Sequence, residues 1–169
     1  MDIELVFGRI VQVESPQDDD NDHFAFCMRR HGTTKVIALA IDEDDIEPIL
    51  QAARGRTTTP PSPQQLMVSV LHKLEIEIVC ARFEGRDDDS ILLASLHLRS
   101  GERLWRIRCR ASDAFSITRL AKAPLYIDEE FFQSLSPFDL PPSEQKPLTG
   151  DLDNISWDDY FHTHKPPEA

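Results

Sequence analysis

Five arginines lie within twelve residues of this sequence, and together their side chains could bind a polyanion. They are Arg99, Arg103, Arg106, Arg108 and Arg110. If the segment is a strand, side-chain alternation places Arg106, Arg108 and Arg110 on one face, where guanidinium groups can contact phosphates. These three residues are the predicted nucleic-acid contacts. The alternative is a solvated strand face that offsets the charge of nearby acids.

The charge of the whole chain opposes such a partner. The 169 residues include 18 Lys and Arg against 30 Asp and Glu, which gives a formal net charge of −12. The average field therefore repels a phosphate backbone. Any role in nucleic-acid binding must depend on a local basic patch.

The other polar groups lack the spacing of familiar sites. The acidic runs at residues 18–20 and 87–89 fall in predicted loops and lack the spaced ligands and glycine of a calcium loop. The six histidines show no metal-ligand spacing with cysteine. The sequence has no phosphate-binding glycine loop, dinucleotide turn, serine elbow or cysteine–histidine pattern, so nucleotide hydrolysis, dehydrogenase and acyl-transfer chemistry have no support.

The cysteines and the N-terminus predict a soluble cytoplasmic protein. Cys27, Cys80 and Cys109 are an odd number without paired spacing, and each has apolar neighbours, as a reduced core thiol would. The N-terminus lacks the basic start and apolar run of a signal peptide. No stretch approaches the length of a membrane span, so we expect no membrane partner.

Alternating β-rich segments predict a sheet. They cover residues 3–13, 24–28, 35–41, 75–84, 90–98 and 103–109. We expect a turn at His31-Gly32-Thr33 to join the second and third strands into a hairpin, and the last three strands to form a meander. The fold class is α+β, with a mainly antiparallel sheet and about three helices packed on it.

Two helices are expected between the hairpin and the meander. The first follows Asp42 as its cap, has apolar residues at positions 46, 49, 50 and 53, and stops at Gly55. The second begins at Ser62, with a proline in its first turn and Gln65 completing a capping box. We expect this second helix to bury four apolar side chains: Leu66, Val70, Leu71 and Leu74.

A third helix, from about Ser112 as its cap to Ala121, should follow the meander. A short strand at 124–127 and a helical turn at 128–133 then complete the predicted domain, residues 1–133.

Residues 134–169 are predicted to be a mobile, acidic, proline-rich tail. They hold six of the twelve prolines and seven acids against two bases, a composition typical of chains that do not pack. Within the tail, the aromatic and acidic segment 155–161 is of the kind that docks into a groove of a protein partner. The alternative is a strap that folds back on its own domain.

The third helix and its flanks resemble the bifunctional nuclease (BFN) domain family. Arg110-Ala111-Ser112-Asp113-Ala114 is similar to the Arg-Pro-Ser-Asp-Ala signature of that family, and Ala123-Pro124-Leu125-Tyr126-Ile127 to the Ala-Pro-Ile-Phe-Val strand that follows it. The proline turn and helix over residues 59–74 are also similar. The resemblance covers roughly residues 1–135 and is strongest over 35–130.

The resemblance implies a nuclease and nominates catalytic residues. Asp113 matches the signature aspartate, and Asp45 is the nearest match to an acid at the start of the first helix of the family. With Mg²⁺ or Mn²⁺ as cofactor, these carboxylates and Arg110 form a minimal set for metal-assisted hydrolysis of RNA or DNA. In the alternative, Asp113 only suits the dipole of its helix, and Arg110 pairs with it or with an acid of another element.

Three departures from the family pattern favour a second hypothesis. The signature proline is Ala111, and the aspartate usual two residues before the signature arginine is Arg108. The histidine and acid that the family carries after a threonine are Pro63-Gln64 after Ser62. The alternative function is therefore a non-catalytic protein-interaction or regulatory module of the same fold, whose sheet binds another protein or another copy of the chain, the latter forming a homo-oligomer.

Overall fold

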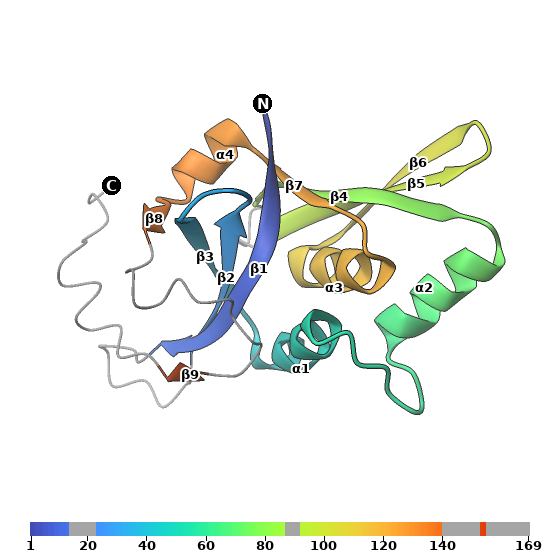
Figure 1. Ribbon diagram of the computed structural model, residues 1–169, viewed down its shortest axis with the longest axis horizontal. Helices are drawn as coiled ribbons and strands as arrows, with labels where there is room; N and C mark the ends of the chain where they lie inside the picture. Colours follow the sequence, from blue (N-terminus) through green and yellow to red (C-terminus); the bar gives the residue numbers. More distant parts are fainter. Residues whose placement is uncertain (14–22, 87–91, 140–152, 155–169) are drawn as a thin grey trace.

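The computed structural model describes residues 1–13, 23–86, 92–139 and 153–154 (Figure 1). The strands are β1 (Asp2–Val13), β2 (His23–Arg30), β3 (Lys35–Ile41), β4 (Glu77–Arg86), β5 (Leu92–Ser100), β6 (Arg103–Arg110), β7 (Leu125–Asp128), β8 (Phe138–Asp139) and β9 (Asp153–Asn154). The helices are α1 (Glu43–Ala53), α2 (Pro63–Lys73), α3 (Ala111–Ala121) and α4 (Glu129–Ser134).

The described strands form one sheet in the order β6-β5-β4-β7-β1-β2-β3-β8, with β9 beside β1. Most pairs are antiparallel, including the predicted β2–β3 hairpin and the β4–β5–β6 meander. Only β4–β7 and β1–β9 are parallel among the described strands. The α+β class and the mainly antiparallel sheet are thus confirmed.

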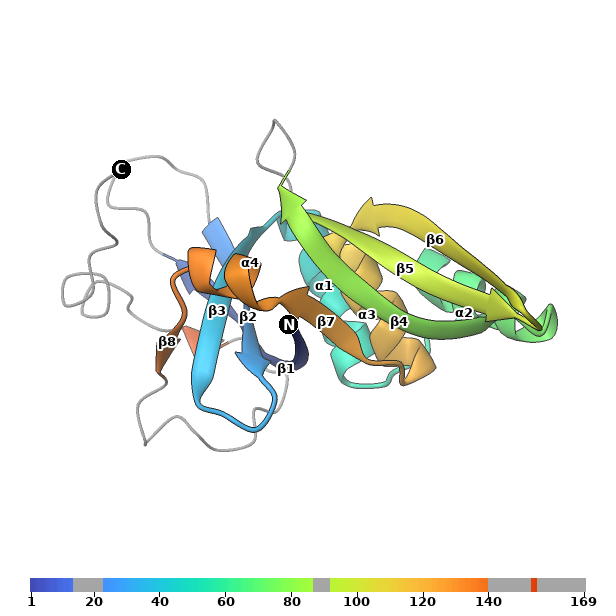
Figure 2. The ribbon, with the colours of Figure 1, turned by 90° about the horizontal axis from the view of Figure 1, so that it is seen from above.

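Helix α3 is the central packing element. It contacts α1, α2 and strands β4 to β7, and it lies with α1 and α2 on one face of the meander (Figures 1 and 2). Its Phe115 ring lies 4.7 Å from Phe26 of β2 and 5.4 Å from Phe7 of β1, measured between centroids. The same helix therefore packs against both halves of the sheet. We call the opposite face of β4, β5 and β6 the outer face.

The start of α2 follows the predicted capping box. Ser62 Oγ accepts a hydrogen bond from the Gln65 backbone N–H at 3.3 Å, and Gln65 Oε1 accepts one from the Ser62 N–H at 3.2 Å. Gln65 is buried because it also bonds the loop before the helix, donating to the carbonyl of Arg56 at 2.7 Å. These bonds fix where α2 begins and therefore where its first turn lies.

The predicted burial along α2 is wrong at three of four positions. Leu66, Val70 and Leu74 are 54%, 44% and 62% exposed, whereas Leu71 is half-buried and packs against the core with Val68. The reason is that α2 makes its main contacts, among the described residues, with α3 and β4, along one narrow face. The i, i+4, i+8 ridge of the three exposed residues points away from both.

The predicted cap of α3 is also wrong. Arg110, which still has the extended backbone of β6 (φ −69°, ψ 154°), is the N-cap, and Ser112 lies inside the first turn. A guanidinium has no acceptor atom, so Arg110 makes no side-chain cap. Its side chain is instead available to the acids at the ends of neighbouring helices.

Two short strands come from the segment predicted to be the tail. Phe138 pairs with Val36 of β3, and Asn154 pairs with Gln12 of β1. Residues 140–152 and 155–169, which include the predicted docking segment 155–161, lie outside the described residues. The domain boundary at residue 133 stays a prediction. No helix of the described residues is long and apolar enough to cross a membrane.

Candidate functional site

The first turns of α1, α2 and α3 are linked by polar side chains. Asp45 is the third residue of α1, Gln64 the second of α2 and Asp113 the third of α3, while Arg110 occupies the N-cap position of α3. Because α3 packs against both other helices, side chains far apart in the sequence meet at these helix ends. We call this set, Asp45, Gln64, Arg110 and Asp113, the helix-end network.

Arg110 joins the two predicted catalytic acids. Its Nη2 lies 3.2 Å from Asp45 Oδ1, and its Nε donates to Asp113 Oδ2 at 3.1 Å. Gln64 Nε2 donates to the other oxygen, Asp113 Oδ1, at 3.1 Å. The side chains of Arg110, Asp45 and Asp113 are 52%, 13% and 29% exposed. The cation is therefore accessible, and the carboxylates are more shielded.

The electrostatics of this network favour an ionised arginine between two anions. The hydrogen bond to Asp113 raises the pKa of Arg110, burial opposes this, and the charges of Asp113, Asp45 and Asp42 raise it further. The positive ends of the α1 and α3 dipoles stabilise the carboxylates in their first turns. The same arrangement can also hold the helices together without any chemistry.

The oxygen donors fit a hard divalent cation in a minimal way. No group of three or more His, Cys, Asp or Glu side chains is placed for a metal within the described part of the chain. However, Gln64 Oε1 is buried without a hydrogen-bond partner, beside Asp113. Mg²⁺ is often bound by one or two carboxylates, with waters and substrate phosphates completing its shell. Asp45, Asp113 and this amide oxygen are donors of the type that Mg²⁺ takes, and Arg110 lies between the two carboxylates.

The three predicted nucleic-acid contacts do not act as one patch. Arg106 lies opposite His97 and Arg108 opposite Ser95, on the outer face of the meander. Arg110, two residues further along, instead contacts the carboxylates of the helix-end network. The prediction that these arginines share a strand is confirmed. However, Arg106 pairs with Glu84, whereas Arg110 pairs with Asp45 and Asp113.

Arg106 belongs to a second polar cluster, which no sequence motif predicts. Arg106 Nη2 donates to Glu84 Oε1 at 2.5 Å, and Ser95 Oγ donates to the same oxygen at 2.5 Å. Ser95 Oγ also lies 3.2 Å from His97 Nε2. We call Glu84, Ser95, His97 and Arg106 the outer-face network. In the sequence, polar residues alternate along each of the three strands that supply this network. The register that brings those residues together cannot be deduced from the sequence.

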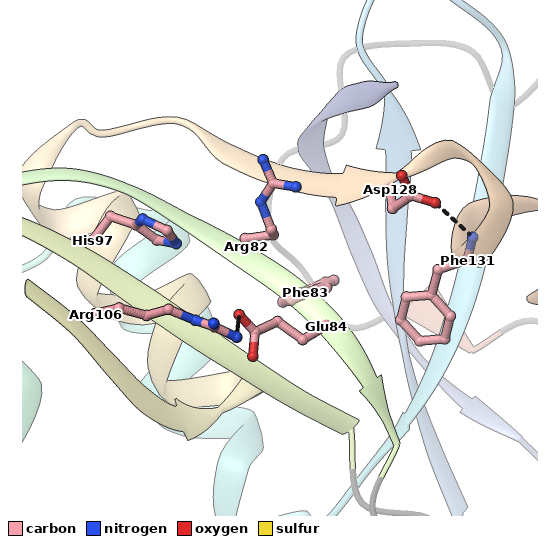
Figure 3. Close-up of a pocket in the computed structure, with 7 residues that line it drawn as sticks. All are labelled: Arg82, Phe83, Glu84, His97, Arg106, Asp128 and Phe131. Carbon is pink, nitrogen blue, oxygen red and sulfur yellow. Dashed lines mark hydrogen bonds and ion pairs between the residues drawn. The ribbon is translucent and has the colours of Figure 1, made fainter.

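The outer-face network borders a cavity of about 430 Å³ (Figure 3). Figure 3 shows Arg82, His97 and Arg106 on one side of the cavity and Asp128 and Phe131 on the other. Burial would raise the pKa of Glu84, but hydrogen bonds from Arg106 and Ser95 and the charges of Arg106 and Arg108 outweigh it and hold that pKa below its ordinary value. Glu84 is therefore a shielded carboxylate that stays ionised at neutral pH.

The comparison with protein families agrees with the resemblance read from the sequence. A search of curated proteins finds no match. The family model for the bifunctional nuclease domain matches residues 27–138, a range that includes all the residues of both networks. Since this match covers more than half of the chain, the protein belongs to the bifunctional nuclease domain family.

Proposed function

We propose that the protein is a hydrolase that cleaves phosphodiester bonds of RNA or DNA at the helix-end network, with Mg²⁺ or Mn²⁺. The observation that supports this is the convergence of Asp45 and Asp113, from two helices, on Arg110 at 3.2 and 3.1 Å. Carboxylates can hold a divalent metal ion, and a cation beside them can stabilise charge on the phosphoryl oxygens.

Each residue has a distinct role in this proposal. Asp45, Asp113 and the unpartnered Gln64 Oε1 would hold the metal ion. A bound divalent cation polarises a phosphoryl oxygen and makes water more acidic. Arg110, which is half exposed, exchanges a carboxylate oxygen for an oxygen of the scissile phosphate and stabilises its charge there. The adjacent helix N-termini add partial positive charge that favours an anion.

Substrate binding should be weak and strongly dependent on salt. The chain carries a net charge of −12, so only local cations such as Arg106, Arg108 and Arg110 can attract the backbone. Asp45, Arg110 and Asp113 do not line the described cavity of about 430 Å³ beside the outer-face network. Arg110, whose side chain is 52% exposed, is the part of the helix-end network that is most accessible to a substrate.

Cleavage of labelled single- and double-stranded RNA and DNA, with Mg²⁺, Mn²⁺ or EDTA, tests the proposal. We expect metal-dependent cutting that falls by about 10²-fold or more in Asp113→Asn and Asp45→Asn. Asp44→Asn is the matched control, because Asp44 is an exposed acid in the same turn of α1. No cutting by a folded wild type, or equal losses in all three variants, would overturn the assignment of the site.

The alternative, an interaction module that binds a second copy of the chain, is supported by a separate observation. Apart from Met1, every exposed large hydrophobic residue of the described chain lies on α2, at its C-cap residue Leu74 or on β6, and these two elements lie at the same end of the molecule (Figures 1 and 2). These residues are Leu66, Met67, Val70, Leu74, Leu104, Trp105 and Ile107. Exposed apolar surface of this kind is typical of interaction sites.

A second copy of the chain is the partner that best fits the exposed edge of β6. This strand is the edge of the sheet, so one side of its backbone can pair with another strand. Antiparallel pairing of two copies about Arg106 would set Trp105 of each opposite Ile107 of the other, a favourable aromatic–β-branched pair. The two Arg106 side chains would face each other, but each already has Glu84 as a partner.

Analytical ultracentrifugation of the full chain at micromolar concentration tests this alternative. We expect a dimer that dissociates in Ile107→Glu and Val70→Glu and persists in His72→Glu, an exposed control position on α2. A monomeric wild type would exclude the homo-oligomer. A dimer that is unaffected by both substitutions would place the interface elsewhere.

Two further parts of the proposal concern location and partners. A cytoplasmic location is supported by Cys27, Cys80 and Cys109, none of which forms a disulfide among the described residues, as expected in a reducing compartment. A protein partner for the aromatic segment 155–161 stays a prediction. Pull-down with and without this segment is the measurement that checks it.

A further inference from the structure

The outer-face network brings together an acid–base set that the helix-end network lacks. Glu84 is on β4, Ser95 and His97 are on β5, and Arg106 is on β6, so three adjacent strands each supply a part. The register sets His97 directly opposite Arg106. The set therefore contains a carboxylate, an imidazole and a guanidinium on one face of the meander.

Ser95 fixes the distance between the carboxylate and the imidazole. Its side chain is fully buried, and its hydroxyl contacts both Glu84 Oε1, at 2.5 Å, and His97 Nε2, at 3.2 Å. Because Ser95 gives its proton to Glu84, His97 Nε2 must be the donor toward Ser95. Ser95 thus holds Glu84 and His97 close together on the outer face.

The cations of the cavity are more accessible than the carboxylate. The Arg106 side chain is 55% exposed and the Glu84 side chain 16%. Arg82, which pairs with Asp2, adds a second guanidinium to the wall of the cavity. An incoming anion can therefore take Arg106 from Glu84 and leave the carboxylate free to accept a proton.

One reaction of nucleic acids needs only these groups. In RNA the 2′-hydroxyl lies next to the phosphodiester, so the substrate supplies its own nucleophile and requires a base, an acid and a cation. We propose that the outer-face cavity is a second site, which cleaves RNA without a metal ion by attack of the 2′-hydroxyl on the adjacent phosphate. DNA, which lacks this hydroxyl, cannot react there.

In the proposed reaction, one P–O bond forms as another breaks, and one proton is transferred at each of the two oxygens. Glu84 accepts the proton of the 2′-hydroxyl as its oxygen bonds to phosphorus, and the bond from phosphorus to the 5′-oxygen of the next nucleotide breaks. Protonated His97 gives its proton to that leaving oxygen, while Arg106 stabilises the charge on the phosphoryl oxygens. The products are a 2′,3′-cyclic phosphate and a 5′-hydroxyl, and solvent returns the proton from Glu84 to His97.

The cavity also suits a nucleotide in size and lining. Its volume is about 430 Å³, and Phe131 of α4 lies across it from His97 and Arg106 (Figure 3). Unpaired bases of single-stranded RNA are commonly held by stacking on aromatic side chains. We therefore expect single-stranded RNA as the substrate, with a base beside Phe131 and its phosphate at Arg106.

A DNA oligonucleotide that contains a single ribonucleotide, incubated with the full chain in EDTA, tests the proposal. We expect one cut, directly 3′ of the ribonucleotide, with a cyclic phosphate end identified by mass spectrometry. Glu84→Gln, His97→Ala and His97→Gln should each lower the rate by about 10²-fold or more. Glu77→Gln is the matched control, because Glu77 is also on β4 and pairs with an arginine, Arg99, at 2.5 Å.

The outcomes separate this site from the metal-dependent one. Cutting at the ribonucleotide in EDTA that persists in Asp113→Asn and is lost in Glu84→Gln supports the second site, whether or not the helix-end network proves active. An uncut ribonucleotide with a folded wild type overturns it. Equal cutting by the wild type and by all Glu84 and His97 variants also overturns it, because that result identifies a contaminating ribonuclease.

Discussion

The helix-end network and the outer-face network are built from similar charges but support different chemistry. In the first, Arg110 lies between two carboxylates, 3.2 and 3.1 Å away, and no histidine is part of the set. In the second, one carboxylate is joined through Ser95 to His97. An excess of carboxylates suits a metal ion, whereas an imidazole beside a carboxylate suits proton transfer. The difference shows that counting charged residues does not identify the chemistry of a site.

The two networks also depend on different parts of the fold. The helix-end network depends on how α1, α2 and α3 pack, because each helix supplies a residue of its first turn. The outer-face network depends on strand register within the meander. Variants that disturb one support without the other can therefore separate the two sites.

The largest expected effect is the loss of both networks together. Phe115 of α3 is buried and packs its ring against Phe26 and Phe7. Phe115→Ala should lower the free energy of unfolding by about 3–5 kcal/mol, measured by urea denaturation. Met67→Ala, at an exposed position on α2, is the control and should change it little. A small loss in Phe115→Ala would mean that α3 does not support the two halves of the sheet.

The second prediction compares the central arginine of each network. Arg110→Ala leaves two carboxylates without their shared cation, one of them the shielded Asp45, and should destabilise the fold by about 1–3 kcal/mol. Arg106→Ala should cost less, because Arg106 is exposed and Glu84 keeps the hydrogen bond from the Ser95 hydroxyl. Denaturation of both variants in the same buffer checks the order. The reverse order would show that Arg110 is not the main link between α1 and α3.

The sequence predicted most of the fold, because its strongest signals are local. Period-two alternation and turns identified the hairpin and the meander, and the Ser62 capping box located the start of α2. The position of β7 between β4 and β1 depends on contacts between residues far apart in the sequence. Local sequence patterns do not indicate such contacts. Leu66, Val70 and Leu74 were wrongly expected to be buried for a related reason, since an apolar pattern does not show how wide a face the neighbouring elements cover.

The two networks differed in how well the sequence could reveal them. Asp45, Arg110 and Asp113 were nominated together through the family resemblance, and the structure places them in contact. Gln64 was seen only as a departure from the family pattern, yet it bonds Asp113. Glu84, Ser95 and His97 matched no motif, because their relation arises from the pairing of β4, β5 and β6.

The third prediction concerns acid pH and the outer-face network. The folded pKa of Glu84 is below its ordinary value, so its contribution to stability is full above that value and is lost as the pH falls through the folded pKa. Wild type should therefore lose more stability than Glu84→Gln below about pH 4.3. Thermal melts from neutral pH to acid, with Glu77→Gln as the control, measure this difference. Parallel curves for wild type and Glu84→Gln would contradict the ionic role of Glu84.

The smallest expected effect is on the reactivity of the Cys109 thiol, whose pKa is influenced by an acid of each network. Burial raises the pKa of its thiol to about 11, and the charges of Asp113 and then Glu84 contribute to the increase. Wild-type Cys109 should therefore react slowly with iodoacetamide, and neutralising either acid should lower the pKa and speed the reaction slightly. Because Asp113 contributes more than Glu84, Asp113→Asn should have the larger effect. Peptide mass spectrometry distinguishes Cys109 from the other thiols. A larger increase in rate in Glu84→Gln than in Asp113→Asn would mean that the charge of Glu84 affects Cys109 more strongly than the charge of Asp113.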